Sequence, residues 1–391
     1  MTAPSPEVRV VRSLTEISPD AWDAIAGTDD PFVEHAFLCL LETSRSVGRG
    51  TGWEPRHVTV WDGGRLVGAL PAYLKDDSWG EFVFDFQWAR AAQAARIRYY
   101  PKVVAMVPYT PATGTRFLVA SDRPRAPIVQ TLLEGLRAMA EDEGASSVHV
   151  NYLDEHERDE ALALGWPKAR VSVQFHFHNQ NEDGKPYASF DDFLARFRSS
   201  ARKQVRRERR EANEGPFTIR TKTGPELDAT DWKALDVFYR MNVARHGSYA
   251  YLTPSFFAEM PRRLGHLVVA SLAYRGSEPI AGTLNFEKGA RLYGRYWGSV
   301  DDAPFLHFEC CYYQLLERAI TKGHTRFEAG AQGHHKLKRG LLPAEVHSVH
   351  WMRDPRLRAA VESFLPEEAA AVRHEIAMLD GEGPFRRGPT E

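Results

Sequence analysis

The pattern of apolar and polar positions predicts the same succession of elements in both halves of the chain. Alternation over residues 57–70, around Gly63 and Gly64, predicts a β-hairpin, and residues 267–284 show the same alternation around Gly276. Each hairpin is followed by a strand, an amphipathic helix and a further strand, at 116–120, 127–143 and 147–153 in the first half and at 291–297, 305–322 and 325–328 in the second. The repeat predicts a duplicated α/β fold with a mixed (α+β) sheet.

Length and composition fit two globular domains. The chain has 391 residues, of which 43% are hydrophobic, and the polar stretch 179–186 separates the halves. We therefore expect domains at 1–180 and 181–380 and a flexible tail at 381–391. No apolar run reaches the roughly 18 residues of a membrane span. The chain also lacks a secretory signal pattern and has three cysteines, so we expect a reduced, cytoplasmic protein.

Positive charge gathers in one predicted helix, residues 189–214, although the whole chain has a net charge of −2 and does not resemble a DNA-binding protein. Like charges at i, i+4 repel, so their persistence favours an anionic partner such as a tRNA backbone or a nucleotide-linked substrate. The alternative is a solvated face relieved by Glu208, Glu211 and Glu214. The candidate phosphate-binding residues are Arg202, Lys203, Arg206, Arg207 and Arg210.

Candidate chemistry lies in the second half. Glu328 ends a strand, and loops after strand ends often hold ligands. In the glycine-spaced loop that follows, we expect Lys336 and Arg339 to contact an anion or an oxyanion, with Gln332 beside them, and Glu328 and His335 to polarise groups or move protons. A plain basic surface loop is the alternative.

The helix 305–322 supplies a second set of candidates. His307 or Glu309 could take a proton from an attacking ammonium, with Tyr313 on the same stripe as Glu309 and available to bind substrate. The alternative is that Glu309 lies on the polar face of the helix and only interacts favourably with the helix dipole. The histidines His347 and His350 lie three apart in a predicted strand, so they face opposite ways, and we expect no metal site.

The first half carries many aromatic residues and no nominated base. Most of these aromatic residues are explained by core packing, and the remainder could line a groove for an acyl acceptor near Lys102 and Tyr109. This half is therefore predicted to recognise substrate rather than to catalyse.

The order of elements resembles the GNAT acyltransferase fold in duplicate. Residues 304–314, 327–336, 99–102 and 110–114 further resemble the FemAB-like family of N-acyltransferases. This resemblance implies two tandem GNAT-like units. It also implies transfer of an aminoacyl group from aminoacyl-tRNA to an amine of a small molecule or a cell-wall precursor, without a further cofactor. A basic helix of the kind seen at 189–214 is likewise similar to one in Fem-type enzymes.

Two alternatives stay open at this point. Other tandem GNAT relatives use acyl-CoA, but neither half has the glycine-rich turn that holds a pyrophosphate: the second offers two aspartates, Asp301 and Asp302, where the anion would lie. A non-catalytic module that binds RNA or a nucleotide on a GNAT scaffold is the alternative of another class. The acyl group, the acceptor and the oligomeric state are left open.

Overall fold

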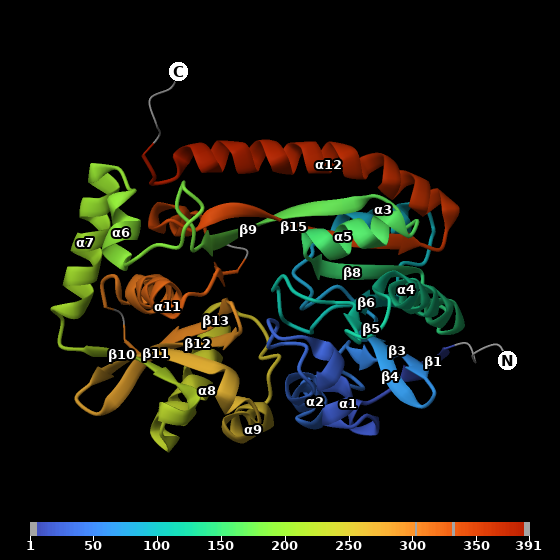
Figure 1. The fold of residues 1–391 in the computed structure, drawn as a ribbon, viewed down its shortest axis with the longest axis horizontal. Coiled ribbons are helices and arrows are strands. Elements are labelled where there is room, and N and C mark those ends of the chain that lie inside the picture. Colours follow the sequence, from blue (N-terminus) through green and yellow to red (C-terminus); the bar gives the residue numbers. More distant parts are fainter. Residues whose placement is uncertain (1–5, 302, 331–332, 387–391) are drawn as a thin grey trace. The chain divides into compact units, whose positions relative to one another are not determined.

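The computed structural model describes residues 6–301, 303–330 and 333–386. The chain forms two compact units (Figure 1). Unit 1 comprises Met1–Ser172 and Glu345–Arg373, and unit 2 comprises Val173–Ala344 and His374–Glu391. The first division thus falls close to the predicted position near residue 180, but a later segment of the chain returns to unit 1.

Unit 1 contains the predicted hairpin, β3 and β4, antiparallel to each other, with β1 and β7 at the two sides in the order β1-β3-β4-β7. Strand β8 pairs with β6 in parallel, and β6 pairs with β5. The main elements of this unit are β1 (Glu7–Val11), α1 (Pro19–Ala26), α2 (His35–Thr43), β3 (His57–Asp62), β4 (Arg65–Leu70), β5 (Ala72–Lys75), α3 (Phe86–Ala94), β6 (Lys102–Ala105), β7 (Leu118–Val119), α4 (Arg125–Asp142), β8 (Ser147–Leu153) and α5 (Glu155–Ala163).

Unit 2 repeats much of this order, without counterparts of β5, α3 and β6. Its strands run β10-β11-β12-β13 with antiparallel pairing, and β13 then pairs in parallel with β14. The elements are β10 (Thr218–Thr223), α8 (Ala229–Arg245), α9 (Pro254–Leu264), β11 (Val268–Arg275), β12 (Glu278–Lys288), β13 (Arg291–Ser299), α10 (Leu306–Phe308), a π-helical turn η4 (Glu309–Tyr313), α11 (Gln314–Lys322) and β14 (Arg326–Glu328). Both units therefore share the order strand, two helices, hairpin, strand, helix, strand, to which unit 1 adds β5, α3 and β6 after its hairpin. The predicted duplication is confirmed.

The last strand of each series crosses to the other unit. Strand β9 (Ala169–His178) follows α5 of unit 1, yet its final residues pair antiparallel with β14 of unit 2. Strand β15 (Leu342–Met352) begins in unit 2 and pairs antiparallel with β8 of unit 1. It leads into α12 (Pro355–Glu382). This exchange explains why residues 345–373 belong to unit 1.

The basic segment 189–214 forms two helices, which corrects the prediction of one. Helix α6 (Phe190–Ala195) begins at the Ser189 cap, and α7 (Ser199–Asn213) begins after Arg198, whose backbone is extended. Phe197, at the break, is buried in the core of unit 2. Burial of this ring is favourable enough to offset the interruption.

The predicted flexible tail is packed over its first residues. Helix α12 continues to Glu382, and the ring of Phe385 lies 5.0 Å from that of Phe197. The backbone N–H of Arg386 donates to the carbonyl of Arg196 at 2.9 Å. Residues 387–391 lie outside the described residues. Among the helices that are described, none has the length and apolar character needed to cross a bilayer.

Candidate active site

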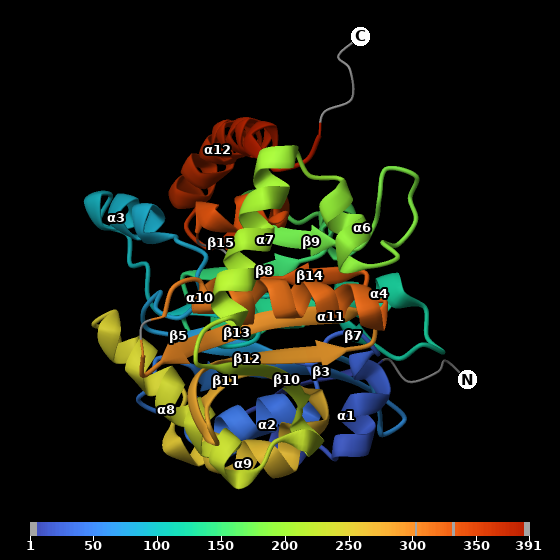
Figure 2. The same ribbon diagram turned by 90° about the vertical axis from the view of Figure 1, so that its left-hand side faces the viewer.

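The candidate site of unit 2 lies where β13 and β14 part. The two strands pair at three positions, ending with Tyr293 opposite Glu328, and β13 continues to Ser299 paired with β12 on its other side. Three successive side chains on this part, Arg295 to Trp297, are half-exposed, although residues nearer the start of the strand are buried. Helices α8 and α9 lie on one side of strands β11–β13 and α11 lies on the other (Figure 2).

Aromatic rings and two histidines gather beside this opening. The ring of His307 lies 5.2 Å from that of Trp297, 5.5 Å from that of Tyr312 and 5.9 Å from that of His335. The hydroxyl of Tyr312 and Nε2 of His335 form a hydrogen bond of 2.9 Å. We call the group Trp297, His307, Phe308, Tyr312 and His335 the aromatic cluster.

Both histidines of the aromatic cluster are neutral at pH 7. Burial is the main cause that lowers the pKa of His307 to about 4, and the neighbouring His335 and Arg339 lower it further. Burial and the neighbouring Arg339 and Lys336 lower the pKa of His335 as well. Neutral imidazole can accept a proton, and His335 is exposed to solvent. The arrangement therefore offers an accessible base.

Lys336 is a buried cation without a carboxylate partner among the described residues. It is 5% exposed, and its Nζ donates to the carbonyl of Gly330 at 3.1 Å. The nearest ring, that of Phe175, has its centre 6.0 Å away. Burial lowers the pKa of Lys336 to about 8, so the ammonium still predominates at pH 7. A positive charge held this way can stabilise a developing or bound anion.

Arg339, the other predicted anion contact, already has partners. Its Nη2 lies 2.8 Å from Glu208 of α7, and its guanidinium carbon lies 3.4 Å from the centre of the Phe308 ring. The Glu208 carboxylate is itself buried, and it also accepts from the hydroxyl of Tyr313 and from Gln204. These contacts tie α7 to η5 (His334–Arg339), so Arg339 and Tyr313 hold the loop that carries Lys336.

The two predicted catalytic glutamates are both paired. Glu309 is fully buried and accepts from Arg209, through Nη2 at 3.0 Å, and from Gln314 at 2.8 Å. Glu328 lies 2.8 Å from Arg326 and 3.7 Å from His176. The catalytic roles of the two glutamates stay predictions. Their contacts indicate that Glu309 holds η4 in place and that Glu328 holds β14 in place.

The remaining predicted substrate residues lie elsewhere. Lys102 is enclosed in unit 1, where its Nζ lies 2.9 Å from Glu81 and 2.5 Å from Asp85. Tyr109 is buried in the same unit and donates to the carbonyl of Ser46 at 2.9 Å. Gln332 lies outside the described residues. The structure therefore brings together His307, His335 and Lys336 from the predicted set.

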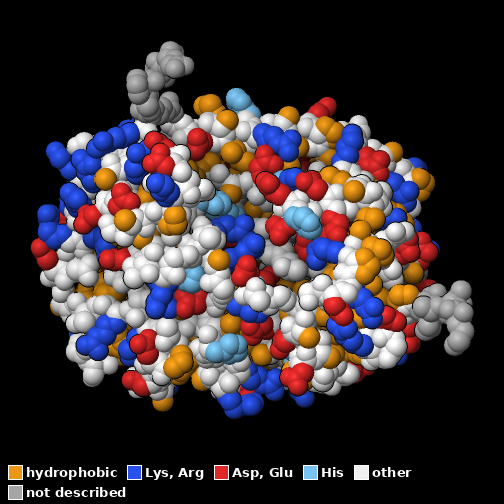
Figure 3. All heavy atoms as spheres, viewed as in Figure 1, with side chains coloured by type: hydrophobic (Ala, Val, Ile, Leu, Met, Phe, Trp, Pro, Cys, Tyr) orange, Lys and Arg blue, Asp and Glu red, His pale blue; other side chains and the backbone are white. Residues whose placement is uncertain are grey.

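Helix α7 has two different faces. Val205, Glu208 and Ala212 are buried, whereas most of its cations point to solvent (Figure 3). Several of these cations have surface acids nearby, because Arg206 lies 3.1 Å from Asp191, Arg207 lies 3.6 Å from Glu211 and Arg210 lies 3.8 Å from Glu214. The exposed cations of this helix are Lys203, Arg206, Arg207 and Arg210, and Arg202 is half-buried. We call these five residues the basic face of α7.

Sequence reasoning missed Glu208, Arg209 and Trp297 as parts of the site. The one available signal was Glu208 itself, because a single acid inside a run of cations on a helix is a candidate for an internal ion pair. Trp297 carried no signal, since a strand tryptophan is usually core. No group of three or more His, Cys, Asp or Glu suited to a metal exists within residues 6–301, 303–330 and 333–386.

Comparison with known proteins identifies the family. The sequence matches the FemAB-like family, described as peptidoglycan biosynthesis/recognition, over residues 13–387. The chain belongs to the FemAB-like family. Membership of this family, with its GNAT-like fold, indicates acyltransferase activity. A search of curated proteins found no match.

Solved structures share the fold of this FemAB-like protein. FemX is 13% identical with a TM-score of 0.52, and the similarity covers 91% of this chain and 100% of FemX. The C-terminal domain of a protein described as a lysylphosphatidylglycerol synthetase, from Agrobacterium fabrum, is 11% identical with a TM-score of 0.52, and 96% of this chain and 100% of that chain are covered. At such low identity these matches show the fold alone, a tandem of GNAT-like units.

Proposed function

We propose that unit 2 transfers an aminoacyl group from aminoacyl-tRNA to an amine of a small molecule or a cell-wall precursor, in the cytoplasm. The observation that carries this proposal is the buried ammonium of Lys336, which lacks a described carboxylate partner and lies in the loop after β14. Attack of an amine on an ester carbonyl creates an oxyanion, and a fixed cation in a dry site stabilises it.

The aromatic cluster supplies the second requirement, removal of a proton from the amine. His335 is neutral and exposed, and its Nε2 is held by the hydroxyl of Tyr312. The attacking ammonium loses a proton to the imidazole, the amine nitrogen bonds to the carbonyl carbon, and the ester bond to the ribose oxygen breaks. The released ribose oxygen takes up a proton. Aminoacyl esters are already activated, so positioning and charge stabilisation suffice.

The basic face of α7 supports tRNA as the donor. Its exposed guanidinium and ammonium groups can pair with phosphates, and its weak surface pairs with acids are easily exchanged for stronger ones. The inner face of the same helix reaches the Lys336 loop through the Glu208–Arg339 ion pair. An RNA bound on α7 would therefore be held by the element that also supports the reacting loop.

The test compares two donors. The protein is incubated with tRNA carrying a labelled amino acid, or with a labelled acyl-CoA, together with a set of primary amines, and transfer of label is followed. We expect transfer from the tRNA, and Lys336→Met should lower it by about 10²- to 10³-fold, as loss of one oxyanion donor does elsewhere. Lys336→Arg keeps the charge and should retain part of the rate.

Variants of α7 test the donor separately. Neutralising Lys203, Arg206 and Arg207 should weaken tRNA binding by about tenfold or more at low salt and flatten its salt dependence. The matched control neutralises Arg65 and Arg123, which form surface ion pairs in unit 1. Transfer from acyl-CoA alone would show that acyl-CoA, and not aminoacyl-tRNA, is the donor. Binding of tRNA without transfer to any amine would favour a non-catalytic RNA-binding module.

A further inference from the structure

Three aromatic side chains in unit 1 are exposed to solvent side by side. Trp79 is 65% exposed, Phe84 54% and Phe86 36%. The ring of Phe86 lies 6.0 Å from that of Trp79 and 6.2 Å from that of Phe84, against which it stacks. We call these three residues the aromatic ridge. A contiguous exposed patch of large apolar side chains marks a surface that contacts something other than water.

The exposed charges that follow the aromatic ridge along the chain are cations. On its other side lies Asp77, which accepts from the backbone N–H of Trp79 at 2.9 Å and pairs with Lys75 at 3.2 Å. Within residues 78–121 the only carboxylates are Glu81 and Asp85, and both are buried beside Lys102. The three cations that this segment exposes form no ion pair with any described carboxylate: Arg90, Arg96 and Arg98. The surface therefore combines apolar rings with unneutralised guanidinium groups, a combination that fits an anionic partner with an apolar interior.

Helix α3 holds this surface firmly. Its inner residues Trp88 and Ala92 are buried and pack with Leu357, Val361 and Leu365 of α12, all within unit 1. In Figure 2, α3 stands out from strands β5 and β8 of the same unit. Phe86 is the first residue of this packed helix, and Trp79 and Phe84 lie in the segment that leads into it. Docking through Phe86 therefore costs little conformational entropy.

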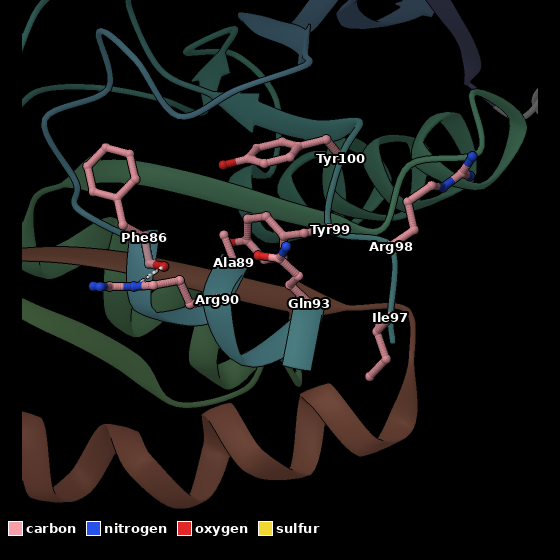
Figure 4. A pocket seen from close by; sticks show the side chains of 8 residues that line it. All are labelled: Phe86, Ala89, Arg90, Gln93, Ile97, Arg98, Tyr99 and Tyr100. Atoms are coloured by element: carbon pink, nitrogen blue, oxygen red, sulfur yellow. Dashed lines mark hydrogen bonds between the residues drawn. The ribbon is translucent and has the colours of Figure 1, made fainter. Parts of the chain in front are cut away.

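A cavity of ≈ 510 Å³ opens between α3 and the segment that follows it. Phe86, Ala89, Ile97 and Tyr100 give it mostly apolar walls, and Arg90 and Arg98 lie at its opposite ends (Figure 4). Both guanidinium groups contact only backbone carbonyls among the described residues, Arg90 that of Phe86 at 3.4 Å and Arg98 that of Gly144 at 2.8 Å. The cavity could thus take an apolar chain whose phosphate lies at an arginine.

We propose that the aromatic ridge and its arginines dock unit 1 reversibly on a bilayer containing anionic phospholipids. The rings enter the boundary between headgroups and acyl chains, where tryptophan and phenylalanine are favourable, and the arginines bind lipid phosphates. A partner protein would need a matching apolar patch ringed by acids, whereas an anionic bilayer offers both features by composition. This inference does not depend on the proposed reaction, because binding is measured without an acyl donor.

The test is flotation of the full chain with vesicles of phosphatidylcholine alone and with vesicles that also contain phosphatidylglycerol. We expect binding only to the anionic vesicles, with release at high salt. Trp79→Ser with Phe84→Ser should abolish binding. Arg90→Gln with Arg96→Gln should weaken vesicle binding by about tenfold or more, since each cation near an anionic membrane surface strengthens binding several-fold.

Matched controls keep the result specific. Tyr249→Ser removes an aromatic side chain that is 86% exposed elsewhere, and Arg262→Gln removes an exposed cation of α9; both should bind as the parent does. All of these side chains are exposed, so unchanged thermal melting will verify folding. Absence of binding to anionic vesicles at low salt would overturn the proposal. A second result would also overturn it: the parent protein forms dimers and binds no vesicles, and the variant at Trp79 and Phe84 loses the dimers. The aromatic ridge would then bind protein.

Discussion

Lys102 in unit 1 and Lys336 in unit 2 are both buried, but their surroundings are opposite. The ammonium of Lys102 lies within 3 Å of Glu81 and Asp85. Burial lowers the pKa of Lys102, but the two carboxylates outweigh burial and raise it above its usual value. The Lys336 ammonium has only the Gly330 carbonyl as a hydrogen-bond partner among the described residues, and burial lowers its pKa to about 8. One cation is neutralised internally, and the other is available for a ligand.

The same contrast holds where the strands part. In unit 1, Arg116 is buried beside β8 and donates to the carbonyls of Asn151 at 2.9 Å and Ala112 at 2.6 Å. In unit 2, the part of β13 beyond its pairing with β14 keeps half-exposed side chains from Arg295 to Trp297. The duplicated framework thus carries a buried, internally bonded arginine in unit 1 and partly exposed side chains in unit 2.

The largest effect on stability should separate the two lysines. Lys102→Met leaves Glu81 and Asp85 buried without their cation, so we expect the free energy of unfolding to fall by about 3 to 5 kcal/mol in chemical denaturation. Lys336→Met removes an uncompensated buried charge, so the free energy of unfolding should stay equal or rise. Adding Glu81→Gln and Asp85→Asn to Lys102→Met should restore part of the loss. Equal denaturation midpoints for the two single variants would break the comparison.

A slightly smaller loss is expected for the neutralised pair of unit 2. Glu208→Gln leaves Arg339 and the Tyr313 hydroxyl without a carboxylate in a buried position, at a cost of about 2 to 3 kcal/mol. Glu211→Gln, on the exposed side of the same helix, is the matched control and should change stability by less than about 0.5 kcal/mol. Thermal melting of both variants measures the difference. If Glu208→Gln melts like its control, α7 is not tied to η5 through this pair.

The pH dependence sharpens the difference between the lysines further. If the Lys336 ammonium is required, the transfer rate should fall as pH rises through about 8, by up to tenfold per pH unit, and Lys336→Arg should move this fall to higher pH. The folded state binds fewer protons than the unfolded state between about 8 and the usual pKa of 10.5. The free energy of unfolding should therefore rise over this window relative to Lys336→Met. A rate that stays level to pH 10 would exclude the ammonium.

The smallest effects should come from the outer face of α7. Arg207→Gln and Arg210→Gln each remove a surface ion pair with Glu211 or Glu214, and the expected change in the free energy of unfolding is below about 0.5 kcal/mol. Denaturation of each variant beside Glu208→Gln tests this. A loss above 1 kcal/mol would mean that these cations support the fold rather than face a ligand.

Local patterns were sufficient to predict the duplicated order of elements. The hairpins at 57–70 and 267–284 and the strand at 147–153 are where alternation and turn residues place them, because these signals lie within a few neighbouring positions. The crossing of β9 and β15 was not predictable, since pairing partners far along the chain leave no local trace. For the same reason the break between α6 and α7, at the buried Phe197, was missed.

The same difference between local and distant contacts decided which residues of the candidate site could be predicted. The glycine-spaced loop pointed to Lys336, whose partners are local. Arg339 and Glu309 also fitted the pattern, but their ion-pair partners, Glu208 and Arg209, lie 131 and 100 positions away. Whether a charged side chain is free or neutralised depends on such distant partners. The sequence alone could therefore nominate charged residues without separating the available ones from the paired ones.

The exchange of β9 and β15 constrains how this gene can be divided. All seven residues of β8 are buried, and without β15 this strand would become an edge with unpaired N–H and C=O groups. An apolar edge of this kind pairs with other chains and aggregates. A chimera that swaps only residues 1–172 with a relative would inherit that edge or a mismatched strand. Recombination between relatives should therefore move residues 345–373 together with the N-terminal segment, as one inherited block.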